Sequence, residues 1–170
     1  PASPDDPYWV IDPLDGSYNF MRGIPLCAVS IALCQGMTPL AGAVYDFVRD
    51  ELVHTNETAG LYRNGERIDR AALGGPSSLS TGIPAATRSN AEAAAKNAES
   101  LNAWGKVRMI GSAALSLSWV AQGKLDGYKE TGIRGWDVAE CWALVAFGLR
   151  NFTVANDDIW SPLEVSANGR

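Results

Sequence analysis

The sequence predicts a layered α/β fold, an α+β sandwich in which an antiparallel sheet is followed by a smaller mixed portion of strands and helices. Up to about residue 68, short apolar runs are separated by turn residues, as in a meander of antiparallel strands. From about residue 81, strand-like runs alternate with helical stretches, as in α/β layers. We therefore expect two portions, residues 1–80 and residues 81–170.

The first portion is expected to consist of short strands separated by turns. Asp12-Pro13 and the stretch QGMTP are turn signals, so each should end the apolar run before it. Residues 57–65 are expected to form a loop. The predicted strands are residues 8–11, 28–34, 40–45 and 51–55.

The second portion follows a GGPSS connector and is expected to contain both strands and helices. Ser89 or Asn90 can cap the Ala-rich and Glu-rich helix that follows, and Gly123 can end the apolar helix before it. The predicted strands are residues 81–86, 107–110 and 125–129. The predicted helices are residues 89–101, 112–122 and 136–147.

Charge and residue usage exclude several classes of function. The formal net charge of −5 provides no basic excess to neutralise phosphates, which argues against a protein that binds the phosphate backbone of a nucleic acid. A small phosphorylated substrate stays open, because a metal ion can supply positive charge locally. No apolar run reaches the length of a membrane span, and no basic-then-apolar leader opens the chain. We expect no nucleic-acid partner and no membrane contact.

The cysteines and the histidine do not point to a disulfide framework or a zinc site. Cys27, Cys34 and Cys141 are odd in number and lie in apolar runs, which favours core thiols. His54, the only histidine, lies on a predicted strand, where a structural role is favoured. The six tryptophans are mostly expected in the core. A reducing compartment, the cytoplasm, is the expected location, with an organelle left open.

The stretch WVIDPLDGSYNF carries the strongest chemical signal. Asp12 and Asp15 flank a stiff Pro-Leu pair, and Gly16 allows a tight turn after them. Ser17 then offers a hydroxyl and a backbone N–H at the start of a helical turn, where an anion is favoured. Such an all-oxygen environment suits Mg²⁺ rather than zinc or copper. The alternative for an isolated Asp-Pro-x-Asp-Gly is a turn with no further function.

The longer pattern resembles the metal-binding signature of the inositol monophosphatase family, a tryptophan followed by Asp-Pro-[Ile/Leu]-Asp-Gly-[Ser/Thr]-x-Asn-[Phe/Tyr]. The second signature of that family, Trp-Asp-x-Ala, corresponds to GWDVAE in this sequence. The resemblance extends over residues 9–146 and implies the sugar-phosphatase type of fold. Further matching stretches are NFMRGIPLCAVSIAL, RNGERI and MIGSAALSL.

The resemblance implies a Mg²⁺ site and a reaction. Asp12 would bridge two metal ions, Asp15 and Asp137 would hold the second ion, and the Leu14 carbonyl would help to hold the first. The implied activity is Mg²⁺-dependent hydrolysis of inositol monophosphate or a related small sugar phosphate by in-line attack of water. Lithium sensitivity and a homodimer are further family traits. Asp137 could alternatively be only the N-cap of the helix that follows.

The resemblance also implies substrate contacts. Gly16 and Ser17 would bind the phosphate through backbone N–H groups, and Ser17, a catalytic residue together with Asp15, would orient the attacking water through its hydroxyl. Ser112 and Ala113 would approach the substrate at a helix start, where capping and packing are the alternative roles. Glu130 would contact a substrate hydroxyl, although by itself it is expected to be a solvated loop residue.

Two departures from the family pattern leave two interpretations open. The family has a segment before the first signature, with a Gly-Glu-Glu motif and an aspartate that takes a proton from the hydroxyl represented by Ser17. This sequence starts at Pro1, and Glu140 and Cys141 stand where small residues are expected. The chain is therefore either part of a complete enzyme whose first segment lies elsewhere, or a truncated, inactive relative that serves as a structural or interaction subunit. In both cases a second copy or a partner should cover the apolar face left open.

Overall fold

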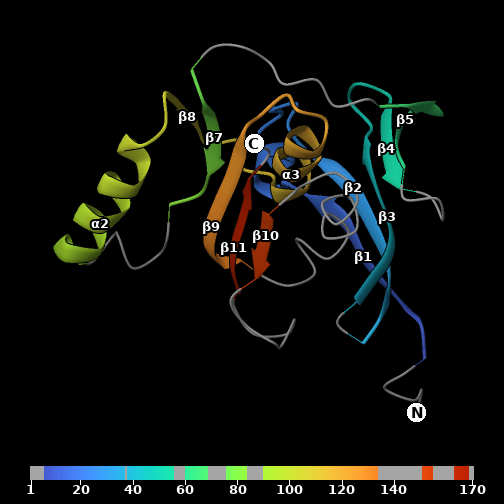
Figure 1. Cartoon of the computed structure of the whole chain (residues 1–170). Coiled ribbons are helices and arrows are strands. Elements are labelled where there is room, and N and C mark those ends of the chain that lie inside the picture. Colours follow the sequence, from blue (N-terminus) through green and yellow to red (C-terminus); the bar gives the residue numbers. More distant parts are fainter. Residues whose placement is uncertain are drawn as a thin grey trace.

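A computed structural model describes residues 6–36, 38–55, 60–68, 76–83, 90–133, 151–154 and 163–168. Two sheets enclose one buried helix, α3, which contacts strands β2 and β3 of the first sheet and strands β9 and β11 of the second (Figure 1). The first sheet is antiparallel and the second is mixed, so the predicted fold class is confirmed.

The first sheet has six antiparallel strands in sequential order. Their bounds are Tyr8–Asp15 for β1, Ala28–Gln35 for β2, Thr38–Asp46 for β3, Glu51–Thr55 for β4, Leu61–Arg63 for β5 and Glu66–Arg67 for β6. Alternate residues of β2 are buried, starting at Ala28, because one face of the strand packs on the core. All four predicted strands are present, and the strand predicted at residues 51–55 has those bounds.

Two expectations for this sheet were wrong at turn signals. The first strand does not end at Asp12-Pro13 but continues to Asp15. Because β1 is an edge strand and its register shifts between Asp12 and Asp15, Pro13 is accommodated in the irregular stretch. The loop expected at residues 57–65 contains β5, which pairs with β6 through a two-residue turn at Asn64 and Gly65. Both turn residues have positive φ, 50° and 83°, as tight hairpins require.

The second sheet has the strand order β10-β11-β9-β7-β8. Its strands are Ser78–Thr81 for β7, Lys106–Arg108 for β8, Gly127–Ile133 for β9, Asn151–Val154 for β10 and Leu163–Asn168 for β11. Strand β7 pairs in parallel with β8 and β9, and β11 pairs antiparallel with β9 and β10. The strand predicted at residues 81–86 was wrong for residues 82 and 83, since β7 ends at Thr81, and residues 84–86 lie outside the described residues. The buried Leu79, Ser80 and Thr81 of β7 lie between two neighbouring strands.

The helices begin at the predicted caps. Helix α2, Ala91–Asn102, starts after Asn90, whose side chain accepts hydrogen bonds from two backbone N–H groups. Helix α3, Ala113–Ala121, starts after Ser112, and Gly123 with φ of 77° follows its end. A short helix, α1, spans Ser17–Met21 directly after the Asp-Pro-Leu-Asp-Gly stretch. The helix predicted at residues 136–147 lies outside the described residues.

Helix α3 forms the centre of the main core. Eight of its nine residues are buried, because it packs against Val44 and Val53 of the first sheet and against Tyr128 and Ala167 of the second. Helix α2 has no buried residue and lies beyond the β8 edge of the second sheet (Figure 1). A helix buried between two sheets therefore joins the two sheets into one core.

The other face of the first sheet is apolar and open within the described part of the chain. Trp9 is 60% exposed and Ile11 is 55% exposed, so the expectation of core tryptophans was wrong for Trp9. A shallow cavity of about 390 Å³ lies on this face. We call this surface the open face; its cavity is lined by Trp9, Ile31, Ala41, Gly42, Ala43, Leu52, His54 and Thr55.

None of the helices in the described ranges is long and apolar enough to cross a membrane.

The cysteines in the described ranges are core thiols, as predicted. Cys27 and Cys34 are both buried in the core, and Cys141 lies outside the described residues. Burial, followed by the negative charges of Asp46 and Asp15, raises the pKa of the Cys27 thiol. His54 stacks on Tyr62 with ring centroids 5.4 Å apart, which supports a structural role.

Glu51 on β4 provides a test of how α3 is held to the first sheet. Its carboxylate accepts hydrogen bonds from Lys124 Nζ at 2.8 Å and from Gln122 Nε2 at 3.1 Å, just after α3. Burial raises the pKa of Glu51, but the hydrogen bonds from Lys124 and Gln122 outweigh burial and hold that pKa below its ordinary value. A depressed pKa in the folded state means that this contribution is present above the unfolded value of about 4.3 and is lost as the pH falls through the folded pKa.

We therefore expect Glu51→Gln to lower the free energy of unfolding by about 0.5–1 kcal/mol near pH 7 and to have little effect at an acidic pH below the folded-state pKa of Glu51. Urea unfolding at the two pH values measures this difference. Glu66→Gln, at an exposed glutamate of β6, is the matched control and should have little effect at either pH. An equal loss at both pH values for Glu51→Gln would contradict the assigned ion pair.

Candidate active site

The centre of the candidate site is the carboxylate of Asp15, at the end of β1. Asp15 is only 8% exposed. Its Oδ2 accepts a hydrogen bond from the Ser112 hydroxyl and another, of 2.9 Å, from the Ala114 backbone N–H. Ser112 in turn caps α3 by accepting the Leu115 N–H at 3.2 Å. The carboxylate therefore lies at the N-terminus of α3, where the helix dipole and unpaired N–H groups favour negative charge.

The turn after Asp15 requires glycine. Gly16 has φ of 76°, and a Cβ at this position would lie 2.6 Å from the Leu26 carbonyl oxygen. Its own carbonyl accepts the Phe20 N–H at 3.0 Å, which starts α1. Ser17, the first residue of α1, is exposed, and both Gly16 and Ser17 line the cavity described below.

Asn19 joins this turn to a segment ninety residues away, and the sequence analysis did not single it out. Its Nδ2 donates to the Leu26 carbonyl at 2.8 Å and to the Ile110 carbonyl at 2.9 Å, with the Gly111 carbonyl at 3.3 Å. The amide thus fixes the start of α1 beside the residues that precede Ser112. The available signal was a polar amide near the end of the stretch WVIDPLDGSYNF, which gives no indication of its partners.

Asp12 lies on β1 three residues before Asp15 and is half-buried. Its Oδ1 accepts the Leu14 N–H at 3.0 Å, which orients the carboxylate as in an Asx turn. Within the described ranges, no three His, Cys, Asp or Glu side chains come together as a metal cluster. The third carboxylate of the prediction, Asp137, lies outside those ranges.

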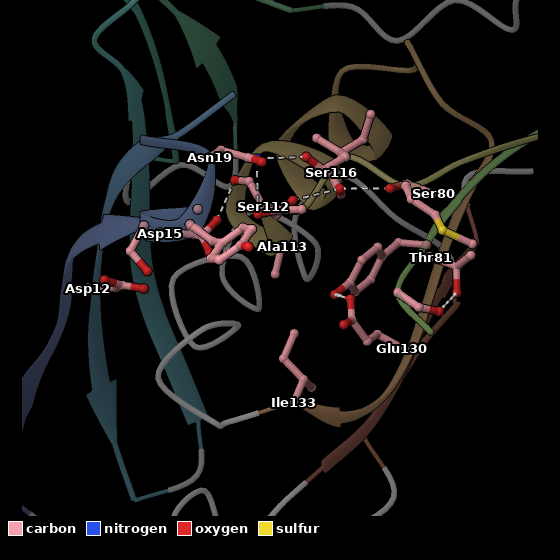
Figure 2. A pocket seen from close by; sticks show the side chains of 18 of the residues that line it. Asp12, Asp15, Asn19, Ser80, Thr81, Ser112, Ala113, Ser116, Glu130 and Ile133 are labelled. Atoms are coloured by element: carbon pink, nitrogen blue, oxygen red, sulfur yellow. Dashed lines mark hydrogen bonds between the residues drawn. The ribbon is translucent and has the colours of Figure 1, made fainter. Parts of the chain in front are cut away.

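A cavity of about 550 Å³ lies between the two sheets and brings the predicted residues together. Asp12 and Asp15 reach it from the first sheet, Ser112 and Ala113 from the start of α3, and Glu130 from the second sheet (Figure 2). Such a volume suits a small organic ligand. The predicted site residues that line it are Asp12, Leu14, Asp15, Gly16, Ser17, Ser112, Ala113 and Glu130.

Two expectations for single residues need correction or extension. Glu130 is not a solvated loop residue, because it lies on β9 and is half-buried. Ser112 caps α3, as the capping alternative predicted, and its hydroxyl also donates to Asp15, while its contact with a substrate stays a prediction. Lining residues that the sequence analysis did not name include Asn19, Ser80, Thr81, Ser116 and Tyr128. The Ser80 and Ser116 hydroxyls form a buried hydrogen bond of 2.8 Å.

The motifs and the cavity agree with the comparisons to known proteins. The model of the inositol monophosphatase family matches residues 1–146, and the chain belongs to this family. A Nus factor SuhB of Xylella fastidiosa is 42% identical over 141 residues, which cover 81% of this chain and 51% of that protein. An inositol-1-monophosphatase of Mesorhizobium japonicum is 39% identical over 135 residues, which cover 77% of this chain and 50% of that protein.

A solved structure extends the likeness to the fold. The inositol monophosphatase of Anabaena (Nostoc) sp. PCC 7120 superposes with a TM-score of 0.82 at 32% identity, covering 96% of this chain and 69% of that chain. The chain spans about half the length of the curated relatives it matches. The family model and the relatives named inositol monophosphatase therefore indicate that phosphatase-type hydrolysis is the activity of the family.

The three-carbonyl contact of Asn19 leads to a prediction about stability. Asn19→Ala leaves the Leu26 and Ile110 carbonyls without this donor, so we expect a loss of about 2 kcal/mol in the free energy of unfolding. Asn19→Asp, which keeps the shape but only accepts hydrogen bonds, should lose at least as much. Urea unfolding measures the free energy of unfolding of both variants.

Asn102→Ala is the matched control, since Asn102 is the exposed last residue of α2. It should change the free energy of unfolding by less than about 0.5 kcal/mol. If Asn19→Ala is as mild as this control, the amide does not hold α1 against the segment before α3.

Proposed function

We propose that this chain provides part of the active site of a Mg²⁺-dependent phosphate-monoester hydrolase that acts on inositol monophosphate or a related small sugar phosphate. The observation that supports this best is the cavity shared by two carboxylates, a helix start and Glu130. Polar groups from both sheets line the cavity, so each of the two ends of a small ligand can be bound. The name of the Mesorhizobium relative supports inositol phosphate as the substrate.

The donor groups at one end of the cavity fit Mg²⁺. Asp12 and Asp15 offer carboxylate oxygens and Leu14 offers a backbone carbonyl, which are the hard oxygen ligands that this ion prefers. Asp137 is proposed as the third carboxylate. Hydrogen bonds from Leu14 N–H to Asp12 and from Ser112 and Ala114 to Asp15 hold the two carboxylates in fixed directions. When bound, Mg²⁺ lowers the pKa of a coordinated water and stabilises charge on the leaving oxygen.

The remaining residues would bind and orient the substrate. Backbone N–H groups of Gly16 and Ser17 would contact the phosphate, and the Ser17 hydroxyl would orient the attacking water. Ser112 and Ala113 would contact the substrate at the start of α3. Glu130, on the other sheet, would accept a hydrogen bond from a hydroxyl of the polyol. Inhibition by lithium and a homodimer are part of this proposal.

A second candidate function is that of a structural or interaction subunit. The open face favours it, because Trp9 and Ile11 expose most of their side chains and an apolar patch of this kind marks a contact surface. The Xylella relative carries the name Nus factor, and the chain matches only about half of that protein. In a complete enzyme, further protein chain or a second copy would cover the same face.

Mg²⁺ binding and phosphate release separate the two candidates. We expect calorimetry to detect Mg²⁺ binding that Asp12→Asn and Asp137→Asn each weaken by at least about tenfold, since each variant removes a charged ligand. Asp50→Asn is the matched control, because Asp50 lies in an exposed turn. Its backbone φ of 53° is one that asparagine also adopts. Release of inorganic phosphate from inositol monophosphate, with and without lithium, is then measured.

Turnover that depends on Asp12 and Asp137 supports the hydrolase proposal. Metal binding that is unaffected by both substitutions would contradict the assigned ligands. If neither binding nor turnover occurs, joining the chain to the segment that precedes the Asp-Pro-x-Asp-Gly motif in a relative distinguishes the candidates. Activity restored by that segment supports the hydrolase, and continued inactivity supports the interaction subunit.

A further inference from the structure

The far end of the cavity contains a buried tyrosine that holds Glu130. Tyr128 and Glu130 lie two residues apart on β9, so their side chains point to the same face of the sheet. The Tyr128 hydroxyl donates to Glu130 Oε2 at 2.6 Å. Tyr128 is only 1% exposed and is among the largest fully buried side chains of the described residues. A ring fixed by packing therefore sets the position of the carboxylate.

The neighbouring strand shapes the space for the same carboxylate. Strands β7 and β9 run in parallel, with Thr81 opposite Lys129, which places Gly82 beside Glu130. A Cβ at Gly82 would collide with the Glu130 carboxylate. The Thr81 hydroxyl donates to the Gly82 carbonyl at 2.9 Å and holds this backbone in place. Gly82 therefore leaves the space that the Glu130 carboxylate occupies, and a larger residue at this position would push the end of the Glu130 side chain aside.

A carboxylate held in this way suits a hydroxyl-bearing ligand. A carboxylate only accepts hydrogen bonds, and one oxygen of Glu130 already accepts from Tyr128. The carboxylate lines the cavity opposite Asp12 and Asp15, so a ligand whose phosphate lies at those aspartates would extend its other end towards Glu130 (Figure 2). An acceptor fixed before binding loses little entropy when a hydroxyl reaches it.

We propose that Tyr128 is a positioning residue that aims Glu130 at a substrate hydroxyl, and that Gly82 provides the space for that orientation. Together they make the site selective for phosphate esters of polyols over esters whose organic group carries no hydroxyl. This inference rests on the proposed function, because Glu130 acts on the substrate only if the cavity binds a phosphate ester. It assigns to Tyr128 an effect on selectivity rather than on the chemical step.

The test compares Tyr128→Phe with Tyr45→Phe. Both variants remove one tyrosine hydroxyl from a carboxylate partner, but Tyr45 bonds Asp50 on the surface, at 2.9 Å. Turnover of inositol monophosphate and of phenyl phosphate, which has no free hydroxyl, is measured with Mg²⁺ for each protein. We expect Tyr128→Phe to raise KM for inositol monophosphate by about threefold to tenfold, with kcat and the phenyl phosphate constants changed by less than about twofold.

Gly82→Ala and the binding of free myo-inositol test the same contact independently. Gly82→Ala should displace Glu130 and produce the same selective loss, even if Tyr128→Phe folds poorly. Binding of free myo-inositol, followed by NMR, reports the hydroxyl end of the cavity without metal or turnover. It should weaken in both variants and stay unchanged in Tyr45→Phe.

The outcomes separate this inference from the proposed function. Equal losses for the two phosphate esters, or no loss for either, would show that Tyr128 is only structural. If the unmodified chain hydrolyses neither ester, the proposed function fails for this chain, and the inositol titration decides the inference. Inositol binding that is insensitive to Tyr128→Phe and Gly82→Ala, or no inositol binding to the unmodified chain, would overturn it.

Discussion

The structure depends on one buried carboxylate and the helix end that receives it. Placing Asp15 inside the protein costs free energy unless donors compensate, and the Ser112 hydroxyl and the Ala114 N–H at the start of α3 are those donors. Since α3 packs against both sheets, this contact fixes the end of β1 relative to the whole core. The carboxylate that the family motif assigns to metal binding is therefore also a structural anchor.

The candidate site follows from this arrangement. Gly16 turns the chain at Asp15, and Asn19 then joins the turn to the carbonyls of Ile110 and Gly111, just before α3. The cavity lies where the layers meet. Asp12 and Asp15 reach it from the first sheet, at the proposed metal-binding end, and Glu130 reaches it from the second sheet, at the proposed polyol-binding end. Substitutions that loosen α3 between the sheets should change both stability and ligand binding, because the same contacts serve both.

Much of this could be predicted from the sequence where the signal is local. The aspartate motif, the caps Asn90 and Ser112 and the strand at Glu51–Thr55 each depend on neighbouring residues. The contact of Asn19 with Ile110 and the position of Gly82 beside Glu130 could not be predicted, since each joins segments that lie far apart in the sequence. The continuation of β1 beyond Asp12-Pro13 also depends on sheet pairing. An edge strand with an irregular register tolerates a proline that a central strand would not. The motif that names the family was more informative than any prediction of single elements.

The most direct test of the account is a double-mutant cycle between Asp15 and Ser112. The free energy of unfolding is measured for the unmodified chain, Asp15→Ala, Ser112→Ala and the double variant, and the cycle isolates their coupling. We predict a coupling of about 1–3 kcal/mol, because each substitution leaves the other group without its buried partner. A coupling below about 0.3 kcal/mol would contradict the claim that this carboxylate and this helix start hold the two sheets and the site together.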